Sequence, residues 1–116
     1  MSRRRDQDYL SDIREAIQRI AVYTAGLNYE QFMQDNKTQD AVVRNLEIIG
    51  EATKNLSNHL RTTHPQISWK DLAGMRDKMI HHYFGINYEI VWTITAEELP
   101  GLLSQIQDIL EELYSC

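Results

Sequence analysis

Residues 44–56 read RNLEIIGEATKNL and form the middle of the most clearly helical stretch of the chain. Apolar residues recur there every three or four positions, the spacing of one face of an α-helix. We predict one helix from about Thr38 to Thr62. Its apolar stripe consists of Val42, Leu46, Ile49, Thr53, Leu56 and Leu60, widened by Val43, Ile48 and Ala52.

This stripe is wider than a single packed seam requires. Either the helix lies centrally and is covered on two sides, or part of the stripe forms a homodimer interface, and the pattern alone leaves both open. Gly50 stands in the middle of the helix, where glycine costs about 1 kcal/mol relative to alanine. We therefore expect close packing there, against another helix or a second copy.

Helical periodicity continues on both sides of this stretch. An N-terminal helix ends at Gly26, and a short segment, YEQFMQD, follows it. A loop containing Pro65 comes next. Ser68 and Asp71 then form a variant capping box for the following helix. That helix is expected to carry RDKMIHHY and to meet Gly85.

The remainder of the chain is also predicted to be helical. Asn87 caps a segment that includes VWTIT, and Pro100 enters a last helix. No segment shows sustained two-residue alternation of apolar and polar residues, so we predict no strand. The 116 residues are thus expected to form one all-α domain over 1–116, an up-and-down bundle of four to five helices.

Charge and cysteine usage limit the possible functions. The net charge of −5 argues against a general nucleic-acid binder, although every Lys and Arg lies at or before Lys78 and could line a local positive cleft. Cys116 is the single cysteine, so no intrachain disulfide is expected. No apolar run is long enough to span a membrane, and a cytoplasmic protein is the default expectation.

The stretch RDKMIHHY, residues 76–83, concentrates residue types that carry chemistry. On a regular helix, Tyr83 would lie about 20° from Arg76, His81 about 140° and His82 about 240°. One regular helix therefore cannot bring Arg76, His81 and Tyr83 to a single point. Either the helix distorts toward Gly85, or a second chain supplies another copy of the motif.

Each of these residues also has an ordinary structural interpretation. Arg76 could form an ion pair with Glu47 or Glu51, and Tyr83 could be a half-buried core aromatic. Adjacent histidines on a helix point about 100° apart, so we predict no metal site.

Metal-free RNA cleavage would need more than one such motif. It requires a base for the 2′-hydroxyl proton, an acid for the leaving 5′-oxygen and positive charge on the phosphate. Histidine can serve as acid or base near neutral pH, and arginine can bind phosphate through two donors. One Arg76 and one His81 give half a site, and two copies across a two-fold axis would complete it.

The spacing Arg76-x4-His81-x-Tyr83 resembles the R-x4-H-x-Y signature of the HepT-like toxins of the HEPN superfamily. Four further blocks resemble the family in the same order. They are DYLSDIREAIQRIAVYTAG, RNLEIIGEATKNL, SWKDLAGMRDKMIHHYFGIN and VWTI…ELPGLLSQI.

The resemblance implies an α-helical HEPN fold that forms a homodimer, or a higher even-numbered oligomer, with the motif at the dimer cleft. It implies a metal-independent ribonuclease without a cofactor, acting on RNA and notably tRNA. It also implies a type VII toxin–antitoxin pair with an MntA-like nucleotidyltransferase. Arg76 would bind phosphate, His81 would be the catalytic acid or base, and Tyr83 would receive AMP from ATP.

Three further residues are candidates for supporting roles. Asp77 could orient Arg76 or His81, and His82 could touch RNA. Glu51 could reach the site or simply pair with a base. A different class of function is also compatible with the weak positive charge, namely a noncatalytic HEPN module that binds nucleotides or scaffolds the nucleotidyltransferase.

Overall fold

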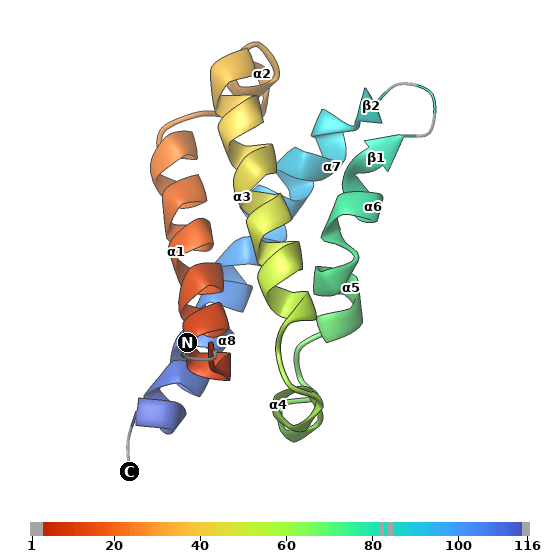
Figure 1. Ribbon diagram of the computed structural model, residues 1–116. Coiled ribbons are helices and arrows are strands. Elements are labelled where there is room, and N and C mark those ends of the chain that lie inside the picture. Colours follow the sequence, from red (N-terminus) through yellow and green to blue (C-terminus); the bar gives the residue numbers. More distant parts are fainter. Residues whose placement is uncertain (1–3, 82, 84, 115–116) are drawn as a thin grey trace.

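The structure, a computed structural model, describes residues 4–81, 83 and 85–114. Its elements are α1 (Asp6–Thr24), α2 (Tyr29–Met33), α3 (Asn36–Lys54), α4 (Asn58–Thr63), α5 (Trp69–Ala73), α6 (Met75–Met79), β1 (Ile80–His81), β2 (Gly85–Ile86), α7 (Tyr88–Thr93), the π-helix η1 (Ile94–Glu98) and α8 (Leu99–Tyr114). The predicted all-α bundle is confirmed, although breaks divide the expected helices into shorter segments (Figure 1).

Helix α3 lies at the centre, with α1 on one side and α5 and α6 on the other (Figure 1). Its stripe residues Val42, Leu46 and Ile49 are fully buried. Val43 and Ala52, which widen the stripe, are buried within the same chain. Coverage on two sides therefore accounts for Val43 and Ala52 without a second copy, whereas Ile48 is only partly buried, and homodimerisation stays a prediction.

The prediction of one helix over residues 38–62 is wrong, because the chain breaks between α3 and α4. A hydrogen-bonded contact with the start of α1 holds the break. The Asp6 carboxylate accepts from the Ser57 backbone N–H at 2.8 Å and from the Ser57 hydroxyl at 2.6 Å. The Ser57 hydroxyl also accepts from a backbone N–H in the first turn of α4, so it caps a new helix there.

The helix expected after Ser68 is also shorter than predicted, since Gly74 separates α5 from α6. Ser68 occupies the N-cap position of α5, but its side chain accepts no hydrogen bond there. The prediction of a capping box formed by Ser68 and Asp71 is therefore wrong. The backbone instead makes a tight turn, in which the Trp69 N–H donates to the Ile67 carbonyl at 3.0 Å.

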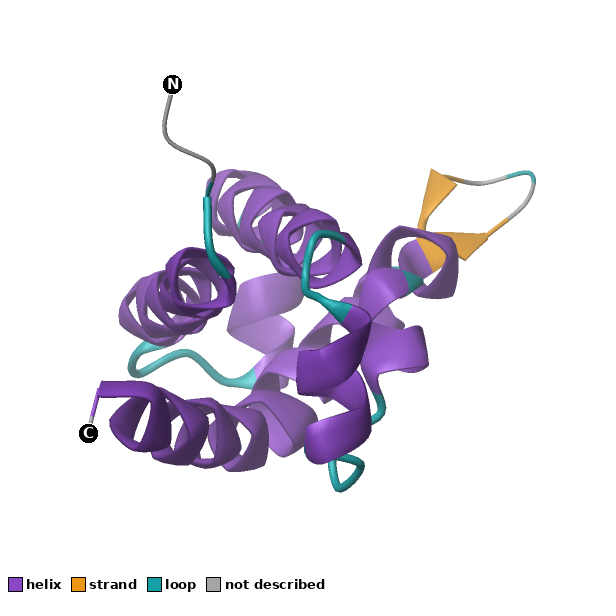
Figure 2. Ribbon diagram, turned by 60° about the horizontal axis from the view of Figure 1, so that its bottom comes forward, coloured by secondary structure: helices purple, strands orange, loops and turns teal. Residues whose placement is uncertain are grey.

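Two short strands follow α6 where helix was predicted, so the expectation of no strand is also wrong. Strands β1 and β2 pair antiparallel, with Ile80 opposite Ile86 and His81 opposite Gly85. The Asn87 N–H donates to the Met79 carbonyl at 2.8 Å, which closes the base of this hairpin. The hairpin projects from one side of the bundle (Figure 2).

The C-terminal helical run is confirmed, but it is one run rather than two helices. The Asn87 side chain caps α7, accepting from the N–H groups of Glu89 and Ile90. Helix α7 continues through η1 into α8. The Leu99 N–H donates to the Ile94 carbonyl, five residues back. This wider turn precedes Pro100, whose ring would clash with a carbonyl four residues back in a regular helix.

Within the described ranges, the helices are all too short or too polar to cross a bilayer.

Gly50 confirms the expectation of close packing, and its neighbours belong to the same chain. A Cβ at this position would lie 3.3 Å from the Leu72 carbonyl oxygen and 3.3 Å from the Met75 Cβ. Helix α3 therefore touches the α5–α6 turn with its backbone. This contact fixes the start of α6, the helix that carries Arg76.

Replacing Gly50 by valine is expected to destabilise the fold by about 1–3 kcal/mol, because the added side chain overpacks this contact. The same change at Gly101, where an added Cβ meets nothing within 4 Å, should alter stability by less than about 0.5 kcal/mol. Denaturant unfolding of the two variants measures both values. Equal stability of Gly50→Val and Gly101→Val would contradict the close approach.

Candidate functional site

The three motif residues lie on one short unit made of α6 and the hairpin. Arg76 is in the helix, His81 is in β1, and Tyr83 is in the turn between the strands. All three are exposed to solvent. The same unit buries Met75 and Met79 completely in the core, so α6 is anchored while its outer face carries Arg76.

The helix ends before the histidine, which changes the geometry expected from a helical wheel. Ile80 has φ −91° and ψ 130°, an extended backbone. His81 therefore follows a strand and not a helical turn. The chain thus leaves the helix before Gly85, as one of the two alternatives requires, but this does not bring Arg76, His81 and Tyr83 to one point, and a second copy of the motif stays a prediction. A complete site still needs a second acid or base, which one copy of the motif does not supply.

Arg76 lines a cavity of about 410 Å³ at the junction of α3 and α6. The other lining residues are Lys54, Ala73, Gly74, Asp77 and Ile80. Within the part of the chain that the structure describes, no salt bridge involves Arg76. The alternative of an ion pair with Glu47 or Glu51 is therefore not found, and the guanidinium is available to an anion.

Glu51 and Asp77 differ in their relation to this cavity. Glu51 is exposed and pairs with Lys54, its Oε1 lying 3.3 Å from the lysine Nζ. Pairing with a base is therefore the alternative that the structure bears out for Glu51. Asp77 lines the cavity together with Arg76. An orienting role of Asp77 stays a prediction.

Tyr83 has 91% of its surface exposed, so it is not a core aromatic of this chain. Its side chain is therefore open to solvent. His82 lies outside the described residues. The turn depends on Gly85, whose φ is +79°, a conformation that side chains with a Cβ rarely adopt.

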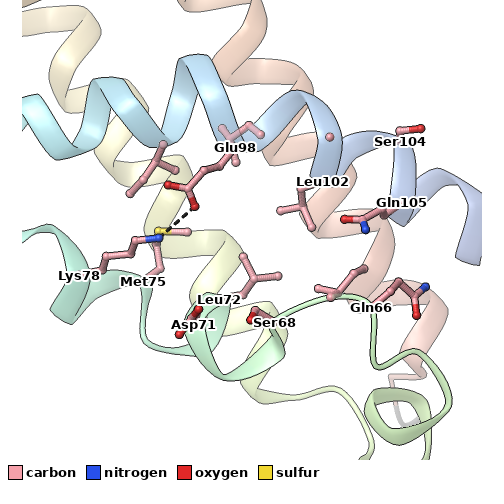
Figure 3. A pocket seen from close by; sticks show the side chains of 14 residues that line it. Gln66, Ser68, Asp71, Leu72, Met75, Lys78, Glu98, Leu102, Ser104 and Gln105 are labelled. Atoms are coloured by element: carbon pink, nitrogen blue, oxygen red, sulfur yellow. Dashed lines mark hydrogen bonds and ion pairs between the residues drawn. The ribbon is translucent and has the colours of Figure 1, made fainter.

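A second hollow of about 550 Å³ lies between the α5–α6 segment and the η1–α8 run. Figure 3 shows Lys78 and Glu98 reaching toward each other across it, 3.0 Å apart. Its walls include the apolar residues Leu72, Met75 and Leu102. None of Arg76, His81 and Tyr83 lines it, and the Lys78–Glu98 pair ties α6 to the C-terminal helices.

Among residues 4–81, 83 and 85–114, no three His, Cys, Asp or Glu side chains are grouped closely enough to hold a metal ion. Metal independence of any reaction stays a prediction.

Sequence reasoning missed two features of this region. The hairpin has a recognisable signal, since Gly85 and Asn87 are both turn-forming residues within the segment FGIN. No sequence signal points to Lys54, because the end of α3 and the start of α6 meet only in the folded chain.

Replacing Gly85 by alanine is expected to strain the hairpin by about 1–2 kcal/mol, because φ is positive there. Since 1.4 kcal/mol corresponds to a factor of ten, the Asn87 amide proton should exchange about ten times faster. Hydrogen exchange read by NMR measures this rate. Gly101→Ala is the control and should leave it unchanged, and an unchanged rate in Gly85→Ala would contradict the assigned role.

The family model described as "Ribonuclease HepT-like" matches residues 13–109. A "Probable ribonuclease HepT" from Thermococcus cleftensis is 45% identical over 107 residues, covering 92% of this chain and 97% of that protein. A Methanocaldococcus jannaschii protein, provisionally named an RNase, is 45% identical over 105 residues, covering 90% of this chain and 87% of its own.

A third relative, from Caldanaerobacter subterraneus and also provisionally named an RNase, is 43% identical over 104 residues. The match covers 90% of this chain and 93% of the relative. No solved structure gives a significant match.

Proposed function

Because the chain belongs to the HepT-like ribonuclease family, we propose that it is a metal-independent ribonuclease toxin that cleaves RNA, with tRNA as its substrate. The match over residues 13–109 carries this proposal, since it includes all of α6 and the hairpin. The exposed Arg76 and His81 on that unit support it from the geometry.

Arg76 and His81 have complementary tasks in the proposed reaction. The 2′-oxygen of a ribose attacks the neighbouring phosphorus, and the bond from phosphorus to the 5′-oxygen breaks. One histidine accepts the proton of the 2′-hydroxyl, and another donates a proton to the departing 5′-oxygen. The guanidinium of Arg76 stabilises the charge that builds on the phosphate oxygens.

The need for two histidines leads to a homodimer. One chain supplies one copy of the motif, and a two-fold axis through the cleft would bring two copies together. Apolar surface on the motif unit supports this arrangement, since Ile80, next to His81 in the chain, is 39% exposed. A second copy that packs on this face would cover Ile80.

We further propose that an MntA-like nucleotidyltransferase neutralises the toxin by modifying Tyr83. The phenol oxygen would attack the α-phosphorus of ATP, forming AMP-tyrosine while pyrophosphate leaves and the phenol proton passes to solvent. The exposure of Tyr83 supports this assignment, because the phenol can enter the active site of another protein. The added phosphate would place negative charge beside the proposed RNA-binding surface.

The first test replaces the proposed catalytic residues. Arg76→Ala and His81→Ala should each slow cleavage of purified tRNA by about 100-fold or more, because each removes a group that acts on the reacting phosphate. Arg19→Ala and His59→Ala, at exposed positions on α1 and α4, are the matched controls and should cleave as wild type does.

Cleavage should also persist in excess chelator. Loss of activity on chelation would contradict metal independence, and full activity of both site variants would contradict the assigned roles. A wild-type protein that binds ATP or AMP but never cuts RNA would instead support the noncatalytic nucleotide-binding or scaffolding module.

The second test concerns the modification. Incubation with ATP, magnesium and the partner nucleotidyltransferase should add the mass of AMP to the peptide that contains Tyr83, and RNA cleavage should fall. Tyr83→Phe should abolish labelling because it removes the attacking oxygen. Tyr114→Phe, at a tyrosine that is 60% exposed, should still be labelled. Label on a residue other than Tyr83 would refute the assignment.

A further inference from the structure

The cavity beside Arg76 contains a second cation, contributed by a different helix. Lys54 is the last residue of α3, whereas Arg76 lies on α6, and both line the same space. We infer that Lys54 is a second phosphate-binding residue of this site and that Glu51 is its internal counter-ion, which RNA displaces. The inference rests on the proposed ribonuclease function. It adds Lys54 to the phosphate-binding residues and a competition between Glu51 and RNA phosphate for the Lys54 ammonium.

An ordinary role for Lys54 would be to offset the negative end of the α3 dipole, as basic residues at helix C-termini often do. In this chain another residue fills that role. The Arg61 Nη2 donates to the carbonyls of Thr53 and Lys54 at 3.1 Å and to that of Leu56 at 3.2 Å. These bonds satisfy carbonyls at the end of α3, so the Lys54 ammonium is not needed there.

The pairing of Lys54 with Glu51 is weak enough to exchange. The two side chains are 56% and 72% exposed, and surface pairs of this kind contribute about 0–1 kcal/mol. A phosphate between Lys54 and Arg76 would meet two cations, whereas Glu51 meets one. Until RNA binds, Glu51 neutralises Lys54, which reduces attraction for other anions.

The position of Lys54 relative to Arg76 is fixed by the backbone. Gly50 packs against the α5–α6 turn one helical turn before Lys54, so the end of α3 cannot move independently of α6. Ala73 and Gly74 line the cavity with small or no side chains, which leaves room for a sugar–phosphate unit. Asp77, which follows Arg76 in the sequence, is the acidic residue that lines the cavity and would lie near the bound phosphate.

The test measures RNA binding in the His81→Ala background, which prevents cleavage during titration. A fluorescein-labelled oligouridylate is titrated at several KCl concentrations. Lys54→Gln should weaken binding and lower the slope of log affinity against log salt by about 0.7, the value for one phosphate contact on single-stranded nucleic acid. Lys54→Arg should retain the slope because it keeps the charge.

Two further variants separate this role from general electrostatics. Glu51→Gln removes the competing carboxylate and should tighten binding about twofold to fivefold, in line with the energy of an exposed ion pair. Lys70→Gln, an exposed lysine on α5 that does not line the cavity, should leave the slope unchanged. A slope for Lys54→Gln equal to that for Lys70→Gln would overturn the inference.

Cleavage of tRNA distinguishes failure of the inference from failure of the proposed function. With His81 intact, Lys54→Gln should raise KM and leave kcat within about twofold, because a ground-state phosphate contact is lost. If wild type cleaves and Arg76→Ala does not, but Lys54→Gln has the KM of wild type, the inference alone fails. If wild type neither binds nor cleaves RNA, both fail.

Discussion

The contact of the α3 backbone at Gly50 with the α5–α6 turn sets the geometry of the whole motif region. A Cβ at Gly50 would stand 3.3 Å from the Leu72 carbonyl oxygen, a distance at which even one methyl group would be crowded. This approach places Lys54 and Arg76, from helices far apart in the sequence, along one cavity. The hydrogen bond from the Asn87 N–H to the Met79 carbonyl then closes the base of the hairpin that carries His81 and Tyr83.

Sequence periodicity was sufficient for the all-α class and for the long helices, because their buried stripes are regular. The cap at Asn87 and the close packing at Gly50 were also predictable, since each residue has a local signature. The break after Lys54 was not, because it depends on Asp6, which is 51 residues from Ser57 in the chain. RDKMIHHY was predicted to be helical from its pattern. The chain instead leaves the helix at Met79, whose carbonyl accepts a hydrogen bond from the Asn87 N–H.

The motif residues were identified from the sequence through a family signature and not through geometry. The helical wheel indicated that a regular helix could not gather them, and the chain does leave the helix at Met79, before His81. Lys54 could not be found in this way, because its place beside Arg76 arises only from helix packing. An acidic chain can still bind RNA if some of its cations are gathered in this manner. Lys78, the last Lys or Arg in the sequence, is instead paired with Glu98 of the acidic C-terminal part of the chain.

The central claim is that two copies of the Arg76–His81 unit form one catalytic centre, and subunit mixing tests it most directly. Wild-type protein is allowed to exchange subunits with a ninefold excess of His81→Ala, and tRNA cleavage per wild-type chain is measured. A shared centre predicts a fall to about one-tenth, since most wild-type chains then pair with an inactive partner. Unchanged cleavage per wild-type chain, with exchange verified by differential mass labelling, would contradict the account.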